Sequence, residues 1–142
     1  MKLSSHFTLE EMVASQEAAR HGIDNTPPAD VVDRLRKTCQ GLEAVRIVLG
    51  CAPIVVSSGF RCLELNRRLG SKDTSQHRTG EAADFICPGF GGPTVVAYAL
   101  RDSGIEYDQL ILEFDRWVHI SFAAKRRRHE ALVIDAGGTR AL

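Results

Sequence analysis

Three residues of this chain have the chemistry of metal ligands, and two of them stand close together. His77 and Asp84 lie in one polar segment, SQHRTGEAADF (75–85), that runs into apolar sequence. Zinc prefers imidazole nitrogen and carboxylate oxygen, and a catalytic site holds it with three protein ligands and leaves a fourth position for water. His119, in the segment WVHIS, is the third candidate, although a lone histidine on a strand is more often structural. The joint occurrence of these residue types favours a zinc site.

The segments around these residues predict the elements that position them. Apolar residues recur at helical spacing in several segments, and β-rich runs are bounded by turn residues. Gly80, between the two candidate ligands, permits backbone angles that other residues resist. We expect helices at about 9–15, 28–49, 62–70 and 93–103, strands at about 52–60, 81–87 and 131–135, and a β-hairpin over 107–123. Since helices come early and strands late, the chain is predicted to be α+β with an antiparallel sheet.

Length and composition limit the alternatives. The 142 residues predict one domain, 1–142, with a basic tail from about 125. Eighteen basic residues balance eighteen acidic ones, so charge does not indicate nucleic acid. No apolar run approaches the roughly 20 residues of a membrane span, and the start lacks the apolar region of a secretion signal. We therefore expect synthesis in the cytoplasm. The cluster KRRRH (125–129) is either a solvated basic face or a patch attracted to anionic wall or membrane polymers.

The four cysteines form no C-x-x-C pair, so a thiolate zinc site is not expected. They are predicted to be reduced and partly buried, with Cys51–Cys62 and Cys39–Cys87 as the alternative bridges.

Three segments together resemble a known family. SSGFR (57–61), SQHRTGEAADF and WVHIS are similar to the three blocks of the M15 zinc peptidases, D-Ala-D-Ala carboxypeptidase-like enzymes that cleave peptidoglycan and are common among phage endolysins. The resemblance implies an α+β, Hedgehog/D-Ala-D-Ala-peptidase-like fold, with a central antiparallel sheet and helices packed on it. It implies that His77, Asp84 and His119 bind Zn²⁺. It also implies that Arg61 holds a substrate carboxylate or a polarised carbonyl.

The residue that accepts the proton of the attacking water is less directly indicated. Several relatives have a glutamate three residues before the last zinc histidine, where this chain has Arg116. Glu113 and Asp115 remain as candidates. A hairpin loop of three residues, 115–117, would place Glu113 directly across from His119, whereas Asp115 would lie about 13 Å away along an extended strand. We therefore predict Glu113 as the general base, although a two-residue loop would turn it to the opposite face.

Other polar residues have supporting interpretations. Ser75 is expected to bond the zinc loop or the substrate, and Trp117 to be a core anchor or a wall of the substrate cleft. Gln76 and Asp108 are candidates to support the ligands.

The expected function is zinc-dependent hydrolysis of peptide bonds in peptidoglycan stem or cross-link peptides, as a carboxypeptidase or an endopeptidase. The resemblance suggests a phage or prophage lysis protein, a monomer that acts at the bacterial cell wall after release and does not bind nucleic acid. The alternatives are a cell-wall-binding module that retains the zinc site with little or no turnover, and a Hedgehog-like signalling domain with a vestigial site.

Overall fold

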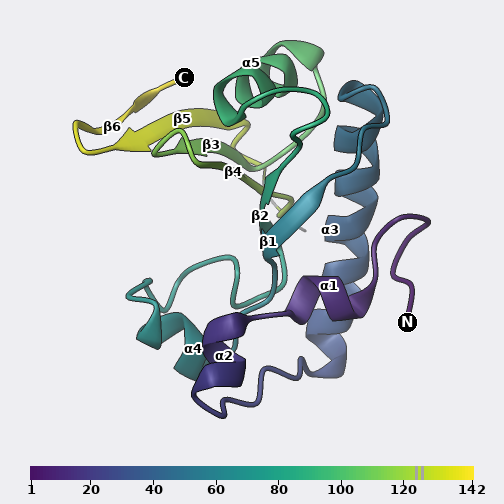
Figure 1. The fold of residues 1–142 in the computed structure, drawn as a ribbon, viewed down its shortest axis with the longest axis vertical. Coiled ribbons are helices and arrows are strands. Elements are labelled where there is room, and N and C mark those ends of the chain that lie inside the picture. The colour runs from purple at the N-terminus through teal and green to yellow at the C-terminus, as the bar shows by residue number, and fades with distance from the viewer. Residues whose placement is uncertain (124, 126) are drawn as a thin grey trace.

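The computed structural model describes residues 1–123, 125 and 127–142, and these residues form helices around one mixed β-sheet (Figure 1). The helices are α1 (Leu9–Val13), α2 (Gln16–Arg20), α3 (Ala29–Val48), α4 (Leu63–Arg68) and α5 (Pro93–Ser103). The strands are β1 (Val55–Ser58), β2 (Ala82–Ile86), β3 (Gln109–Glu113), β4 (Trp117–Ser121), β5 (Glu130–Asp135) and β6 (Gly138–Ala141). The α+β class is confirmed, and every predicted element is present. The patterns did not predict α2 or β6.

The sheet is mixed rather than wholly antiparallel, which corrects one detail of the prediction. Its strand order is β1-β2-β4-β3-β5-β6, and β5 runs parallel to β3 while the other neighbours are antiparallel. The chain reverses direction after β4 and returns on the far side of β3 instead of beside β4. A strand that is antiparallel to β4 in this position must be parallel to β3.

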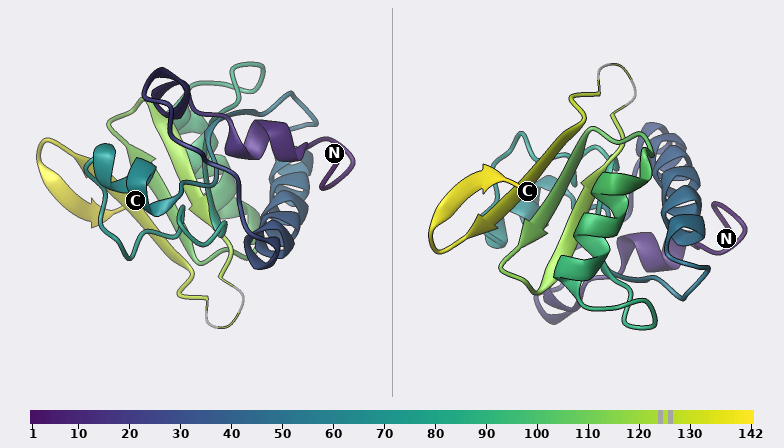
Figure 2. Two further views of the ribbon diagram at one scale, coloured as in Figure 1. Left: turned by 90° about the horizontal axis from the view of Figure 1, so that it is seen from below. Right: turned by 90° about the horizontal axis from the view of Figure 1, so that it is seen from above.

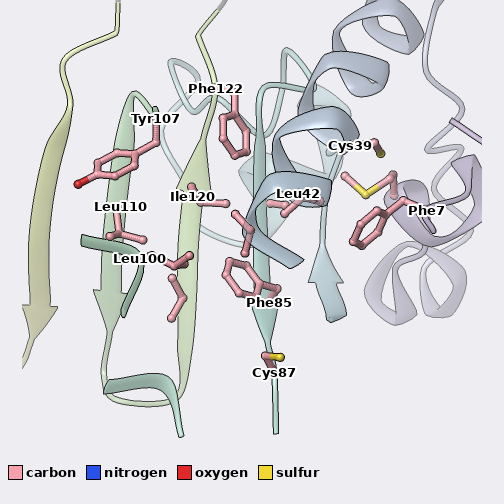
Figure 3. Packing of buried hydrophobic residues seen from close by; sticks show 14 of the residues in the cluster. Phe7, Cys39, Leu42, Phe85, Cys87, Leu100, Tyr107, Leu110, Ile120 and Phe122 are labelled. Carbon is pink, nitrogen blue, oxygen red and sulfur yellow. The ribbon is translucent and has the colours of Figure 1, made fainter. Parts of the chain in front are cut away.

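The alternation of side chains along the strands divides the sheet into two faces. One face carries apolar residues of the core, which are Ala83, Phe85, Leu110, Leu112, Val118 and Ile120. Figure 3 shows three of them, Phe85, Leu110 and Ile120, among the packed side chains of this core. The other face carries Asp84, Ile111, Glu113, Trp117, His119, Leu132 and Ile134. The polar residues singled out in the sequence therefore share the face that is turned away from the core.

Two helices cover the core face of the sheet. Figure 2 shows α5 lying across the strands with α3 beside it. On α3 the apolar residues at helical spacing are buried, among them Val31, Leu35, Leu42 and Val45. Each fully buried side chain of this size contributes about 1.5–3 kcal/mol to folding, so this stripe fixes α3 against the sheet.

The short helix α1 begins as its sequence predicts. The Thr8 hydroxyl accepts a hydrogen bond from the Glu11 amide, and the Glu11 carboxylate accepts one from the Thr8 amide. This reciprocal cap satisfies amides that the first turn of a helix leaves without partners.

The cysteine thiols are free, as predicted. Burial raises the pKa of Cys39 to about 12, so this thiol stays protonated and unreactive at neutral pH. No helix in the described part of the chain combines the length and apolar character that crossing a membrane requires.

Much of the predicted basic tail belongs to the sheet, because residues 130–142 contain β5 and β6. Within the KRRRH cluster, Arg126 lies outside the described residues. Ala124, the residue before the cluster, also lies outside them. Arg127 pairs with the exposed Glu106, and Arg128 pairs with Asp108. These two arginines are thus engaged in ion pairs that anchor the segment entering β5.

Candidate metal centre

A cleft with a volume of about 940 Å³ lies on the sheet face opposite the core. The strands β3, β4 and β5 line one part of it, and the loop between α4 and β2 lines another. Its polar lining residues are Arg61, Ser71, Lys72, Thr74, Ser75, Gln76, His77, Asp84, Gln109, Glu113, His119 and Arg128. The three predicted ligands and Arg61, Glu113, Ser75, Gln76 and Trp117 all line this one cleft, whereas the candidates Asp108 and Asp115 do not.

Strand pairing brings two of the predicted ligands together. Asp84 on β2 and His119 on β4 are direct partners across the antiparallel pair, and both point into the cleft. His119 Nδ1 lies 2.9 Å from Asp84 Oδ1. The loop before β2 supplies His77, whose Nε2 lies 3.3 Å from the same carboxylate oxygen. All three side chains are buried.

A backbone carbonyl fixes the orientation of His77. The ring Nδ1 lies 2.7 Å from the oxygen of Gly59, and a carbonyl can only accept, so Nδ1 carries the proton of a neutral ring. Gly59 reaches this position because it has no side chain: a Cβ there would lie 2.3 Å from the carbonyl oxygen of Met12. The glycine of SSGFR is therefore required by a close approach between two backbone segments.

Gly80 has the conformational role that the sequence predicted. Its φ is +81°, and a Cβ would meet Val31 and Leu35 on α3 at 3.0–3.1 Å. Its carbonyl accepts a hydrogen bond of 2.7 Å from the buried Thr38 hydroxyl. These contacts seat the turn between His77 and β2 against α3.

The three side chains fit a zinc ion. Their candidate ligand atoms lie within 4.8 Å of one another. Because Nδ1 of His77 carries the proton, its Nε2 presents a lone pair to the Asp84 carboxylate, and two lone pairs at 3.3 Å repel unless a cation lies between them. Tetrahedral bonds of about 2.0–2.1 Å place neighbouring ligand atoms about 3.4 Å apart, close to this separation.

The protonation states also suit metal binding, which requires neutral imidazole and ionised carboxylate. Burial lowers the pKa of His77, although the charge of Asp84 opposes this shift. Burial alone would raise the pKa of Asp84, but His77 and His119 outweigh it and hold that pKa below its ordinary value.

Arg61 follows β1 and is held by polar side chains around it. Its Nε donates to the Ser58 hydroxyl at 3.0 Å and its Nη1 to the Ser71 hydroxyl at 3.0 Å. Its Nη2 lies 3.4 Å from Asp84 Oδ2, and the side chain is 13% exposed. The guanidinium is thus fixed at the edge of the donor cluster, with a small part open to the cleft.

The hairpin register differs from the prediction, although the face of Glu113 does not. The loop does have three residues, but they are 114–116, so Glu113 pairs with Trp117 and His119 pairs with Ile111. The predicted register is wrong by two residues. Since strand side chains repeat every two residues, the shift keeps Glu113 on the face of His119, as a diagonal neighbour.

Glu113 is the carboxylate that the structure brings to the cluster. Its Oε1 lies 3.9 Å from His119 Nδ1. Burial, and then the charge of Asp84, raise the pKa of Glu113. Asp115 is exposed in the hairpin loop and accepts a hydrogen bond from Thr94 of α5, away from the cluster. The position three residues before His119, Arg116, is also exposed in this loop.

The remaining predicted residues support or line the cleft. The Ser75 hydroxyl accepts a hydrogen bond of 3.2 Å from the His77 amide, so it braces the ligand loop. Trp117 is partly buried at the cleft wall, with its ring centroid 6.5 Å from that of Phe114. Gln76 donates to Asp108 at 2.7 Å, which links the ligand loop to the residue before β3.

Sequence reasoning missed the residues that hold the functional groups. The Gly59 carbonyl, the hydroxyls of Ser58 and Ser71, and Arg128 were not predicted to serve the site. The Ser-Ser-Gly turn is the only local sequence signal for Gly59 and Ser58, and it predicts only the end of a strand. Arg128 was considered only as part of a basic cluster.

Comparisons with known proteins agree with this geometry. A family model described as Peptidase M15 matches residues 5–121, a range that contains all three candidate ligands, Arg61 and Glu113. A zinc D-Ala-D-Ala carboxypeptidase of Streptomyces albus G is 38% identical over 63 residues, which are 44% of this chain and 24% of that protein. The match thus spans about a quarter of the relative's length. With most of its length matched by the family model, the chain belongs to the M15 peptidase family.

Proposed function

We propose that this chain is a zinc-dependent peptidase that hydrolyses peptide bonds in peptidoglycan stem or cross-link peptides. The observation that carries the proposal is the convergence of His77, Asp84 and His119 beside Glu113 and Arg61 in one cleft. Membership of the M15 family supports it. A D-Ala-D-Ala terminus is named in the description of the Streptomyces relative and is the first substrate to test.

His77 Nε2, Asp84 Oδ1 and a ring nitrogen of His119 would hold the zinc ion. Zinc bound in this way supplies a Lewis acid that acidifies water and polarises a peptide carbonyl. The protein's contribution is to keep the donors fixed: the Gly59 carbonyl sets the His77 ring, and strand pairing sets the other two residues.

Glu113 is proposed to move the proton. Its carboxylate oxygens lie on the cleft face near His119, where Oε1 accepts a proton from the attacking water and returns it to the leaving amine nitrogen. A raised pKa makes this carboxylate a stronger base than an ordinary glutamate. This suits both accepting the proton of the water and returning it to the leaving amine.

Arg61 is proposed to face the substrate. Its guanidinium stays charged at neutral pH and is fixed by Ser58 and Ser71, so it can donate to a carbonyl oxygen that becomes negative or to a substrate carboxylate. Trp117 provides an apolar wall for the bound peptide, and Ser75 keeps the His77 loop in place.

The biological setting follows from the substrate and is part of the proposal. Such a peptidase acts at the bacterial cell wall, and a phage or prophage lysis protein made in the cytoplasm reaches the wall after release. We expect a monomer, because one chain supplies every residue of the proposed mechanism.

A second candidate function is a cell-wall-binding module with little or no turnover. Arg116 favours it, because several relatives carry a glutamate at this position and the arginine here is exposed. Glu113 opposes it, since a carboxylate is present on the cleft face near His119.

The experiment is to incubate the protein with purified peptidoglycan and identify the products by mass spectrometry. We expect release of D-alanine or of cut stem peptides, loss of release on chelation, and recovery with added zinc. Binding to peptidoglycan without any cut product would support the binding module instead.

A further inference from the structure

Arg128 lines the cleft and takes no part in the mechanism above. It lies just before β5 and grips Asp108 with three hydrogen bonds: its amide and Nε donate to Oδ1 at 2.8 and 2.9 Å, and its Nη2 donates to Oδ2 at 2.9 Å. Asp108 is 2% exposed and also accepts from Gln76. The guanidinium plane is therefore fixed from one side by a buried carboxylate.

The other side of this guanidinium is open. The Arg128 side chain is 49% exposed, and its Nη1 donates to no group in the described part of the chain. Arg61 differs, because both of its terminal nitrogens already have partners and only 13% of it is exposed. Of these two cleft arginines, Arg128 has the greater capacity to bind an added anion.

Strand pairing places Arg128 at one end of the cleft. Glu130, two residues after it, pairs with Gln109 at the start of β3, whereas Glu113 is at the end of that strand. The Arg128 guanidinium is held at Asp108, and Ile111, which pairs with His119, lies three residues further on, about 10 Å along an extended strand. An extended peptide covers this distance with about three residues. The donor cluster and Arg128 are thus spaced for two groups of one bound peptide.

We infer that Arg128 binds a carboxylate of the peptide substrate at the end of the cleft away from Glu113. The inference rests on the proposed function, because it names a contact made by the same substrate. A planar guanidinium that is already fixed loses little freedom on binding, and its hydrogen bonds to a carboxylate are charge-assisted. Asp108 is the positioning residue for this contact.

Two carboxylates of a stem peptide can supply the anion, the terminal one and that of D-glutamate. The probes are the pentapeptide L-Ala-D-Glu-L-Lys-D-Ala-D-Ala, its C-terminal amide, and the form with D-Gln in place of D-Glu. Binding is measured to zinc-loaded Glu113→Gln protein, which should not turn the peptide over. Trp117 is the only tryptophan of the chain and lines the cleft, so its fluorescence reports occupancy.

The Glu113→Gln protein is the parent for these measurements. It is expected to bind the full pentapeptide about ten- to a hundredfold more tightly than one of the two amidated forms, the usual range for a charge-assisted contact. The form that binds weakly identifies the carboxylate. Arg128→Met should remove this preference. Arg127→Met is the matched control, since Arg127 is the adjacent arginine and pairs with the exposed Glu106 outside the cleft lining. It should keep the preference.

An Arg128→Met protein with the parental preference would overturn the inference and leave the proposed function intact. Zinc-loaded parent protein that binds none of the three peptides would overturn both. If Arg128→Met does not fold, Arg128→Lys replaces it, because lysine keeps the charge but lacks the planar guanidinium that donates two parallel hydrogen bonds. Its preference should fall at least threefold, and an unchanged preference would overturn the inference.

Discussion

Alanine in place of Gly59 tests how the candidate zinc ligand His77 is held in position. The added Cβ would lie 2.3 Å from the Met12 carbonyl oxygen, about 1 Å inside ordinary contact, so one of the two backbone segments must move. The 2.7 Å hydrogen bond from the Phe60 amide to the same Met12 oxygen opposes that movement. If the Gly59 segment gives way by this amount, its carbonyl no longer reaches His77 Nδ1 at hydrogen-bonding distance.

Two consequences follow, with separate magnitudes. Forcing a methyl group into a packed site costs about 1–3 kcal/mol of unfolding free energy, and strain on the Phe60 hydrogen bond adds up to about 1 kcal/mol. For a chain of this size the melting temperature should fall by roughly 5–15 °C. Loss of the partner that orients a metal-ligating histidine lowers metal affinity by about 10- to 100-fold. Calorimetric melting and zinc titration against a competing chelator measure the two effects.

Gly104→Ala is the control for this experiment. Gly104 ends α5 at a φ of +80° with open space around it, so alanine there strains the backbone without touching the cleft. It should lower the melting temperature and leave zinc affinity unchanged. The reasoning is refuted if Gly59→Ala binds zinc as tightly as wild type, or if both variants lose zinc affinity equally.

The remaining predictions concern the cleft and the pH dependence of stability. Glu113→Gln should keep zinc and lower peptidoglycan turnover by at least about 100-fold, the usual scale for general acid–base catalysis. Asp115→Asn in the exposed loop should have little effect on turnover. The reverse result would show that the general base is misassigned. Arg61→Ala should fold and bind zinc but lose turnover, and normal turnover with normal melting would exclude it from catalysis. The hydrogen bonds from Arg128 lower the pKa of Asp108 below its unfolded value of about 3.9, so its stabilising contribution is complete above that pH and is lost as the pH falls below it. Denaturation between pH 5 and pH 2 should therefore show a steeper loss of stability in wild type than in Asp108→Asn, and parallel profiles would contradict this.

Local sequence patterns predicted the parts of the fold that depend on local physics. The helices predicted at about 9–15 and 28–49 depend mainly on neighbouring residues, and both are confirmed. The prediction that His77, Asp84 and His119 come together depended on a family resemblance, because β2 and β4 pair across 35 residues of sequence. Spacing alone does not specify such a pairing.

The errors arise where a turn without a sequence signal, or contact between distant backbone segments, decides the geometry. The hairpin register was predicted from a loop of 115–117, but Phe114 and Asp115 both adopt positive φ, at 54° and 51°. No glycine marks this turn, although aspartate tolerates that conformation better than most residues. The parallel position of β5 and the contact of the Gly59 carbonyl with His77 are also set by contacts between remote segments.

Zinc content measured together with activity tests the central claim most directly. Purified wild-type protein should contain close to one zinc per chain by elemental analysis and should cut peptidoglycan. His77→Ala should remain folded by circular dichroism while losing most of the zinc and the activity. A His77→Ala protein that keeps one zinc per chain, or a metal-free wild-type protein that still cuts peptidoglycan, would contradict the zinc site at His77, Asp84 and His119.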